Sequence, residues 1–277
     1  MRSFFIFVKK INMKRIVTVF LLIVALVSCN SNDDQVNPVE NVSKKLKSIK
    51  SSTSGRIFEY GANNFITKEY INYGVDGIVG TLDYIYNSKN QIIEIKQQNK
   101  NKEVDGTFRD FIGNTTYKYD NNGLISSSYQ YYKYKNEQDS TRIETVYEYN
   151  NGNLVKKIEE TTDTFNNYYN IHTFYTYTNN KLISAESKLF ENGTYIPGSK
   201  TVSYTYDTKI NPEYSLFPKS YVMIKGYDVN NIISYFDDKN PNASYDNVFE
   251  YDKDNFPNKT STTYKNGNEI EYFYEYQ

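Results

Sequence analysis

The chain contains few of the side chains that enzymes use for chemistry. His172 is its only histidine and Cys29 is its only cysteine. One histidine cannot build a metal cage of several imidazoles, and it leaves a single imidazole for proton transfer. His172 stands just ahead of a Tyr-x-Tyr phrase, so we interpret it as an ordinary strand residue. Neither a Gly-x-Ser-x-Gly elbow nor a glycine-rich phosphate loop is present.

Carboxylates are plentiful, and a facing pair of them can hydrolyse a glycosidic bond. Candidate pairs such as Asp237 with Asp238 and Asp252 with Asp254 lie in predicted turns. Aspartate in a turn caps the local backbone and needs no further role. Asp252, Asp254 and Asn255 could offer oxygens to Ca²⁺, but they lack the full pattern of a calcium loop. We therefore predict a protein that is not an enzyme and has no metal or cofactor, with a glycosidase or lyase as the less favoured alternative.

Cys29 is better explained by lipidation than by a free thiol. Leu26-Val27-Ser28-Cys29 resembles a bacterial lipobox, in which the cysteine becomes the lipidated first residue. It follows a short basic start at Met13 and an apolar run of about a dozen residues, which is too short to span a bilayer. We expect residues 1–28 to be a lipoprotein signal peptide, with translation starting at Met13.

The segment after the signal predicts where the protein resides. Residues 29–52 are polar and lack periodicity, so we predict a flexible tether. Asp33 and Asp34 resemble the acidic export tag that sends lipoproteins of Bacteroidetes-type bacteria to the cell surface. We therefore expect a lipid anchor in the outer membrane and exposure on the cell surface, with the periplasmic leaflet as the alternative.

The charge of the mature chain argues against nucleic acid as a partner. The cleaved segment carries five of the 32 basic residues and none of the 33 acidic ones, which leaves a net charge of −6. Phosphate backbones require basic surfaces. The remaining composition favours strands, with 30 Tyr, 16 Phe and no Trp, because tyrosine and threonine fit a pleated sheet and asparagine fits its turns.

A short phrase recurs throughout residues 53–277, which we predict to form one repeat domain. The phrase is Tyr, any residue, Tyr, a turn cluster, and then an apolar residue, as in Tyr147-Glu148-Tyr149 followed by a turn and Leu154. Alternation places both rings on one face of a strand, and the Asp, Asn and Gly cluster reverses the chain, so each phrase predicts a β-hairpin. In six copies the fifth residue after the second tyrosine is apolar. The second tyrosines are Tyr60, Tyr86, Tyr119, Tyr149, Tyr177, Tyr206, Tyr251 and Tyr274, with a degraded copy at Tyr227.

These hairpins predict an all-β fold. Roughly 14 to 18 antiparallel strands cannot stay in one flat sheet, because strand twist accumulates. We expect a meander of repeated hairpins coiled into an open or closed barrel-like sheet with the tyrosine face inward; the alternative is a β-solenoid. Residues 208–220 break the rhythm with two prolines, which predicts a long loop or an edge excursion. We expect no helix outside the signal peptide.

The phrase resembles the YD repeats of Rhs-type shell proteins. A closer likeness is to Bacteroidetes outer-membrane lipoproteins with such repeats, which form a domain family of unknown function. There an Asn-Asn-aliphatic turn precedes a Tyr-x-Tyr-Asp phrase and an aromatic-Pro-x-Lys landing, which correspond here to Asn230-Asn231-Ile232, Phe249-Glu250-Tyr251-Asp252 and Phe256-Pro257-Asn258-Lys259. The resemblance implies a β fold and a surface location, and it implies no activity.

Tyrosines outside the repeat are the candidate binding residues. Tyr195, Tyr214 and Tyr221 lie in irregular segments, where a ring is free to stack on a sugar face. Asp139-Ser140-Thr141 matches a short acceptor pattern for O-glycosylation, with Ser140 as the acceptor. We predict a non-enzymatic surface lipoprotein that binds a polysaccharide or another envelope protein. The alternatives are a purely structural repeat spacer or shell, and a carrier of a small molecule or lipid.

Overall fold

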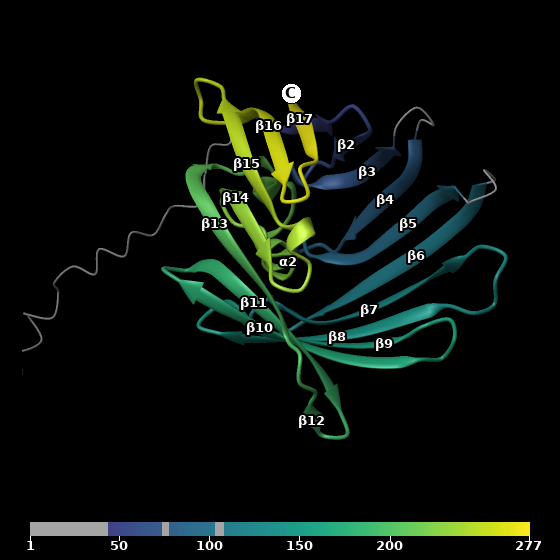
Figure 1. Cartoon of the computed structure of the whole chain (residues 1–277). Coiled ribbons are helices and arrows are strands. Elements are labelled where there is room, and N and C mark those ends of the chain that lie inside the picture. The colour runs from purple at the N-terminus through teal and green to yellow at the C-terminus, as the bar shows by residue number, and fades with distance from the viewer. Residues whose placement is uncertain (1–43, 74–77, 103–107) are drawn as a thin grey trace, which may run out of the picture. The chain divides into compact units, whose positions relative to one another are not determined.

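Antiparallel strands make up nearly all of the structure, a computed structural model that describes residues 44–73, 78–102 and 108–277. Within these ranges there are 17 strands, and almost every strand pairs with the next one along the chain. The two-residue β12 is the exception, because it pairs only with β11. The neighbour of β11 in the barrel is β13. β1 pairs with both β2 and β17, which closes the other 16 strands into a barrel (Figure 1). The predicted barrel-like meander is confirmed in its closed form.

The first nine strands are β1 (Leu46–Lys50), β2 (Ser54–Tyr60), β3 (Ile66–Tyr73), β4 (Ile78–Tyr86), β5 (Ile92–Lys102), β6 (Phe108–Tyr119), β7 (Ile125–Tyr134), β8 (Thr141–Asn150) and β9 (Asn153–Thr162). The others are β10 (Tyr168–Thr178), β11 (Lys181–Glu191), β12 (Thr194–Tyr195), β13 (Lys200–Ile210), β14 (Asn230–Asp237), β15 (Tyr245–Tyr251), β16 (Pro257–Tyr264) and β17 (Glu269–Tyr276). The helices are η2 (Pro212–Leu216), α2 (Lys219–Lys225) and η3 (Pro241–Ala243).

The barrel begins earlier in the chain than predicted. β1 lies within residues 29–52, which the sequence assigned to the tether. Leu46 is 1% exposed and Ile49 is 7% exposed, and both belong to the core. The lysines around them gave this short strand the appearance of a solvated segment. Its pairing with β17 and β2 is what closes the ring, so the folded domain includes it.

The second tyrosine occupies the same place in seven of the predicted phrases; Tyr227, the degraded copy, lies in no strand, and Tyr274 has no such register shift. In seven hairpins the strand register shifts by one residue just before that tyrosine, as between Glu59 and Tyr60. Such a bulge increases the local twist that a closed barrel needs. In the hairpins with longer turns the tyrosine then faces the first residue of the return strand, as in the pair Tyr119 and Ile125. That residue, not the one before it, is the fully buried one in the hairpins with longer turns.

The turns fall into two types, and the geometry of each type accounts for the residues found in it. In three of the longer turns the Asp or Asn directly after the tyrosine caps two backbone N–H groups. Asp120, for example, accepts from Asn122 and Leu124, both at 2.9 Å. Gly123 in the same turn has a left-handed φ of 79°. The shorter turns have two consecutive left-handed residues, such as Asn151 and Gly152, which is the type I′ geometry of tight hairpins.

Tyrosine hydroxyls connect neighbouring hairpins. Tyr119 Oη donates to the carbonyl of Ile92 at 2.7 Å, and Ile92 begins the return strand of the preceding hairpin. Tyr86 does the same to Ile66 at 2.7 Å, and Tyr149 to Ile125 at 2.8 Å. The ring therefore fills the interior while the hydroxyl satisfies a backbone group of the next repeat. Equivalent bonds run from Tyr60 to Leu46 and from Tyr276 to Pro257.

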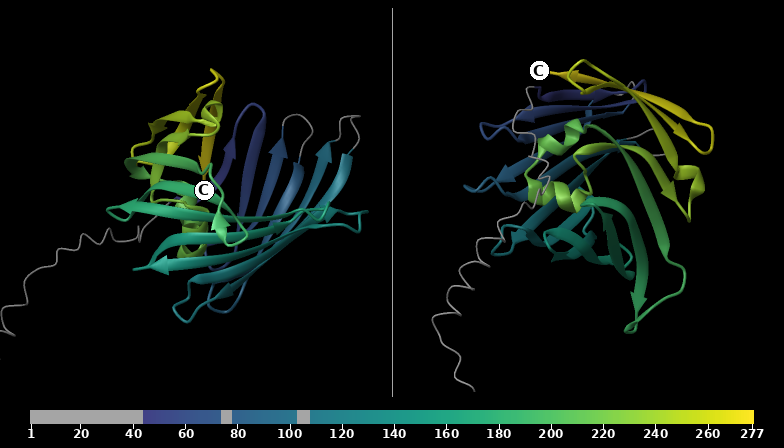
Figure 2. Two further views of the ribbon diagram at one scale, coloured as in Figure 1. Left: turned by 60° about the horizontal axis from the view of Figure 1, so that its bottom comes forward. Right: turned by 90° about the vertical axis from the view of Figure 1, so that its left-hand side faces the viewer.

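A helical segment occupies the barrel interior beside these rings (Figure 2). We call residues 211–229, which contain η2 and α2, the plug segment. Leu216 is 0% exposed and Val222 is 1% exposed, and both pack in the core cluster with wall residues of β1 to β7. The prediction of a loop or edge excursion at residues 208–220 is therefore wrong, as is the expectation of no helix. The prolines start helices here, since Pro212 lies in the first turn of η2 and Pro218 is the N-cap of α2.

The described helices are short. None of those within the described residues is long and apolar enough to cross a bilayer.

Candidate ligand-binding cavity in the barrel lumen

A cavity of about 430 Å³ lies inside the barrel between the plug segment and the wall formed by β1 to β4 and β17. Its volume is in the range of pockets that hold small organic molecules. Alternation along the strands places these wall residues on the same face as the inward tyrosines. The lining residues are Ile49, Ser54, Gly55, Arg56, Glu69, Ile71, Leu82, Tyr84, Phe217, Tyr221, Lys225, Tyr227 and Tyr272.

Arg56 is the centre of a charged network in this cavity. Its Nε donates to Glu69 Oε1 at 2.6 Å, and its Nη1 donates to Glu213 Oε2 at 2.5 Å. Glu69 is only 3% exposed and also accepts from Tyr84 Oη at 3.0 Å. Burial alone would lower the pKa of Arg56, but the charges of Glu213 and Glu69 outweigh it and hold that pKa well above the usual value. The guanidinium thus stays charged and joins the wall to the plug segment.

Lys225 is the second cation of the cavity, and it is placed differently. It lies in the last turn of α2, and its side chain is exposed to the cavity rather than covered by neighbours. Desolvation within the barrel, together with the charge of Arg56, lowers its pKa. Among the described residues no carboxylate lies within ion-pair distance of its Nζ, because both nearby glutamates are bound to Arg56.

Aromatic rings form much of the remaining lining. Tyr84 packs against Phe217 with ring centroids 5.2 Å apart and against Tyr221 at 6.4 Å. Desolvation, and then the charge of Glu69, raises the pKa of Tyr84 well above its usual value. Desolvation also raises the pKa of Tyr221 and of Tyr227. These hydroxyls are therefore neutral donors at physiological pH, in a site that combines ring surfaces, hydroxyls and one free ammonium group.

The structure distributes the three predicted binding tyrosines over two places. Tyr221 is 5% exposed, lines the cavity and belongs to the core, so it cannot act as a surface ring. Tyr214 is half-buried against the same core within η2. The sequence predicted both residues to lie in an irregular surface segment. They lie inside the barrel because that segment folds into it. Only Tyr195 lies on the outer surface, where it is 43% exposed.

Tyr195 is joined to the only histidine of the chain. The hairpin at β12 folds over the outside of β10 and β11, and Tyr195 Oη lies 2.9 Å from His172 Nδ1. His172 stacks on Phe190 at 4.7 Å, and Tyr195 contacts Phe174 at 5.8 Å. Burial and the charge of Lys156 lower the pKa of His172. His172 is a strand residue, as the sequence indicated, and it forms part of an aromatic cluster that the sequence did not reveal.

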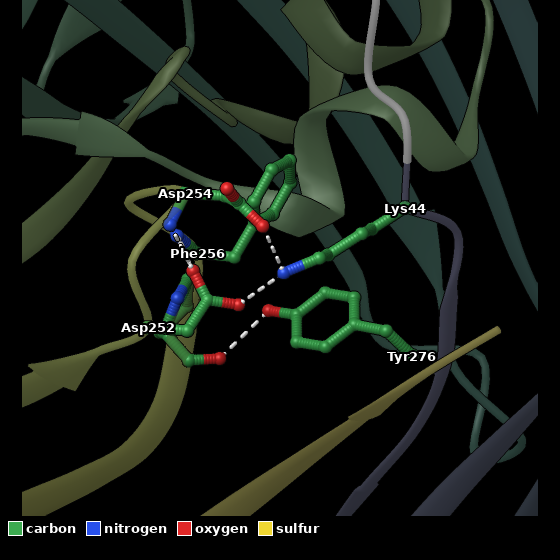
Figure 3. A network of polar contacts seen from close by, with 6 residues as sticks. Lys44, Asp252, Asp254, Phe256 and Tyr276 are labelled. Carbon is green, nitrogen blue, oxygen red and sulfur yellow. Dashed lines mark hydrogen bonds and ion pairs between the residues drawn. The ribbon is translucent and has the colours of Figure 1, made fainter.

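The paired aspartates are occupied by structural contacts. Asp252 Oδ1 accepts the backbone N–H groups of Asp254 at 2.9 Å and Phe256 at 3.0 Å, as a turn cap does. Lys44 Nζ lies 2.7 Å from Asp252 and 2.6 Å from Asp254, so one ammonium group pairs with both carboxylates (Figure 3). This ion pair fixes the start of the domain to the turn between β15 and β16.

The second aspartate pair is engaged in the same way. Asp237 is 2% exposed, pairs with Lys200 at 2.7 Å and caps the N–H groups of Lys239 and Asn240. Asp238 accepts from the backbone N–H of Thr201 at 2.8 Å. Both side chains therefore hold a turn in place instead of facing each other across a cleft.

Two further predicted sites remain as predictions. Ser140 lies in the connection before β8, half-buried, and its hydroxyl accepts a long bond of 3.4 Å from Arg142. Cys29 lies outside the described residues.

The charged residues of the cavity were missed by the sequence analysis, although a signal was present. Arg56 stands two residues before Phe58 and four before Tyr60, on the face of the strand that carries the inward rings. A charge on that face must lie inside the barrel, where it needs a partner. Lys225 and Glu213 gave no such signal, because no strand alternation extends through the plug segment.

The fold and the cavity define a closed β-barrel with a helical plug segment and a cavity in its lumen. No known family model matches the chain, and no curated protein matches its sequence. Among solved structures it is similar to a porin-like protein from Bacteroides vulgatus ATCC 8482, with 12% identity over 84% of this chain and 99% of that chain and a TM-score of 0.43. A porin-like protein from Bacteroides uniformis ATCC 8492 gives 12% identity, 84% and 98% coverage and a TM-score of 0.39. Similarity at this level carries no functional information.

Proposed function

We propose that this protein is a non-enzymatic, lipid-anchored protein of the outer membrane that binds a small molecule inside its barrel. The observation that carries the proposal is the cavity of about 430 Å³ between the plug segment and the wall. It is concave, largely aromatic and apolar, and it contains a few directed polar groups, as small-molecule sites do. Small-molecule carriage, a less favoured alternative on sequence alone, becomes the leading function.

The outer face of the barrel supports a position beside the membrane rather than within it. Cross-strand ion pairs run along that face, such as Lys68 with Asp83 at 3.4 Å, Lys156 with Glu148 at 3.4 Å, and Lys259 with Glu271 at 2.5 Å. A barrel wall that faces lipid is apolar over about 25 Å of its height. The lipobox at Cys29 supplies the membrane attachment instead, and Asp33 and Asp34 favour display at the cell surface.

Binding inside the barrel is tested by blocking the cavity. Leu82 lines it, and the chain has no tryptophan, so Leu82→Trp both fills the space and introduces a fluorescent reporter. The control is Val248→Trp, at an outward residue that is 68% exposed. Protein purified from membranes of its native host is analysed by mass spectrometry under native conditions. We expect a bound small molecule on the wild type and on Val248→Trp but not on Leu82→Trp. Equal occupancy of all three, or none on the wild type, would contradict the proposal.

A second candidate function, contact with a polysaccharide, is favoured by exposed aromatic rings on the outside. Phe165 is 84% exposed, Tyr168 is 58% exposed and Tyr195 is 43% exposed. Aromatic rings of this kind stack on sugar faces. Binding of the wild type to an array of host glycans, with a loss of signal in Tyr195→Ala, would support it. An array without signal would remove its support and leave the lumenal function untouched.

A further inference from the structure

The charged side chains around the cavity are not all engaged in ion pairs. Besides Arg56 and Lys225, β9 places Lys157 on the inward face, since it pairs with Tyr147, whose ring packs on the core. Lys157 is bound to Glu159 at 3.0 Å. Glu69 and Glu213 are bound to Arg56. Every glutamate of this group thus has a cationic partner. Of the two cations that line the cavity, Arg56 is ion-paired, and Lys225 has no carboxylate partner among the described residues.

The position of Lys225 makes its unpaired ammonium group available to a ligand. Its side chain reaches the cavity from the plug segment, opposite the apolar wall residues Ile71 and Leu82. Tyr84 and Tyr227 line the same space and carry neutral hydroxyls. Placing a cation in such surroundings without a partner is costly, and its lowered pKa reflects that cost. An anion at this point would remove the cost.

We propose that the molecule bound in the lumen is an organic acid, whose anionic group pairs with Lys225 and whose apolar body lies against Ile71, Leu82 and Phe217. The inference rests on the proposed function, because it assigns a ligand class to that same cavity. The body has to be apolar or aromatic, since the wall facing Lys225 offers ring and aliphatic surface. A free inorganic anion would leave that surface unused.

The test compares two fluorescent probes of similar shape, one anionic and one neutral. Anilinonaphthalene sulfonate carries the acid group, and N-phenyl-1-naphthylamine lacks it. We expect the wild type to bind both probes, and Lys225→Met to bind the sulfonate at least tenfold more weakly while it keeps its affinity for the neutral probe. Lys225→Arg should retain most of the sulfonate affinity. The matched control is Lys219→Met, an exposed lysine of the same helix that does not line the cavity.

The outcomes separate this inference from the function on which it rests. If Lys225→Met binds both probes as the wild type does, and Leu82→Trp binds neither, the cavity binds ligands but the assignment of an acid is wrong. If Leu82→Trp binds both probes unchanged, the probes lie outside the lumen and the proposed function fails as well. Inorganic phosphate serves as a competitor: displacement of the sulfonate at millimolar concentration would overturn the requirement for an apolar body.

Discussion

Arg56 Nη1 on β2 donates to Glu213 Oε2 in η2 at 2.5 Å, across 157 positions of the sequence. The contact joins the barrel wall to the plug segment, and the same guanidinium holds the almost fully buried Glu69. It therefore determines both where the plug segment lies and which charges remain free in the cavity.

Removing this guanidinium should destabilise the whole barrel. Arg56→Met leaves the buried carboxylate of Glu69 without its cation, and the expected loss is roughly 3 kcal/mol of unfolding free energy. Urea unfolding followed by circular dichroism measures it. Lys68→Met is the control, because Lys68 is paired with Asp83 on the solvent-exposed outer face and should cost less than about 1 kcal/mol. Similar losses in the two variants would show that Arg56 does not hold the plug segment.

The hydroxyl bonds between hairpins should be measurable one at a time. Tyr119→Phe keeps the ring but removes the bond to the Ile92 carbonyl, so we expect a loss of about 1 kcal/mol. Tyr129→Phe makes the same chemical change at a tyrosine that is 40% exposed on the outer face, and it should be close to neutral. Thermal or urea unfolding of both variants decides the matter. An unchanged unfolding free energy in Tyr119→Phe would mean that ring packing, and not the hydroxyl bond, stabilises the contact between hairpins.

The same tyrosines predict a loss of stability in alkali. Burial raises the pKa of Tyr119 to about 12, and it raises the pKa of Tyr60, Tyr86 and Tyr149 from the usual 10.0 as well. A pKa that is higher in the folded state means that the folded chain keeps its protons longer than the unfolded chain. The contribution to stability is therefore complete below pH 10 and declines as the pH rises toward 12.

A spectrophotometric titration of the phenolate band measures this effect. We expect part of the tyrosines to ionise only together with unfolding, well above pH 10. The urea-unfolded chain is the control and should titrate in one step near 10. A folded protein whose 30 tyrosines all titrate near 10 would contradict the inward placement of the rings.

Lipidation at Cys29 is the prediction on which the membrane location depends. Cys29→Ser should abolish incorporation of a labelled fatty acid and move the protein from the membrane fraction to the soluble fraction. The fold should not change, because the barrel begins at β1. Circular dichroism of the variant serves as the control. Retention of Cys29→Ser in washed membranes would argue for attachment through the barrel or a partner.

Local patterns in the sequence were sufficient for the hairpins. The Tyr-x-Tyr spacing predicts two inward rings, and the structure packs Tyr117 and Tyr119 on the core. Asp120 and Gly123 predict a turn, and they form one with a side-chain cap and a left-handed glycine. These features depend on strand alternation and on the backbone preferences of single residues. Both are determined by residues that are close together in the sequence.

The tertiary structure decided the closure of the sheet, the interior position of the plug segment and the site. β1 has only five residues, and its role becomes evident only when β17 lies beside it. A tyrosine is equally suited to a surface loop and to a barrel lumen, so the sequence around Tyr221 could not show which of the two it occupies. Lys225 is a candidate ligand partner only because Arg56 takes both nearby glutamates. Each of these outcomes depends on contacts between residues far apart in the chain, which no local sequence pattern specifies.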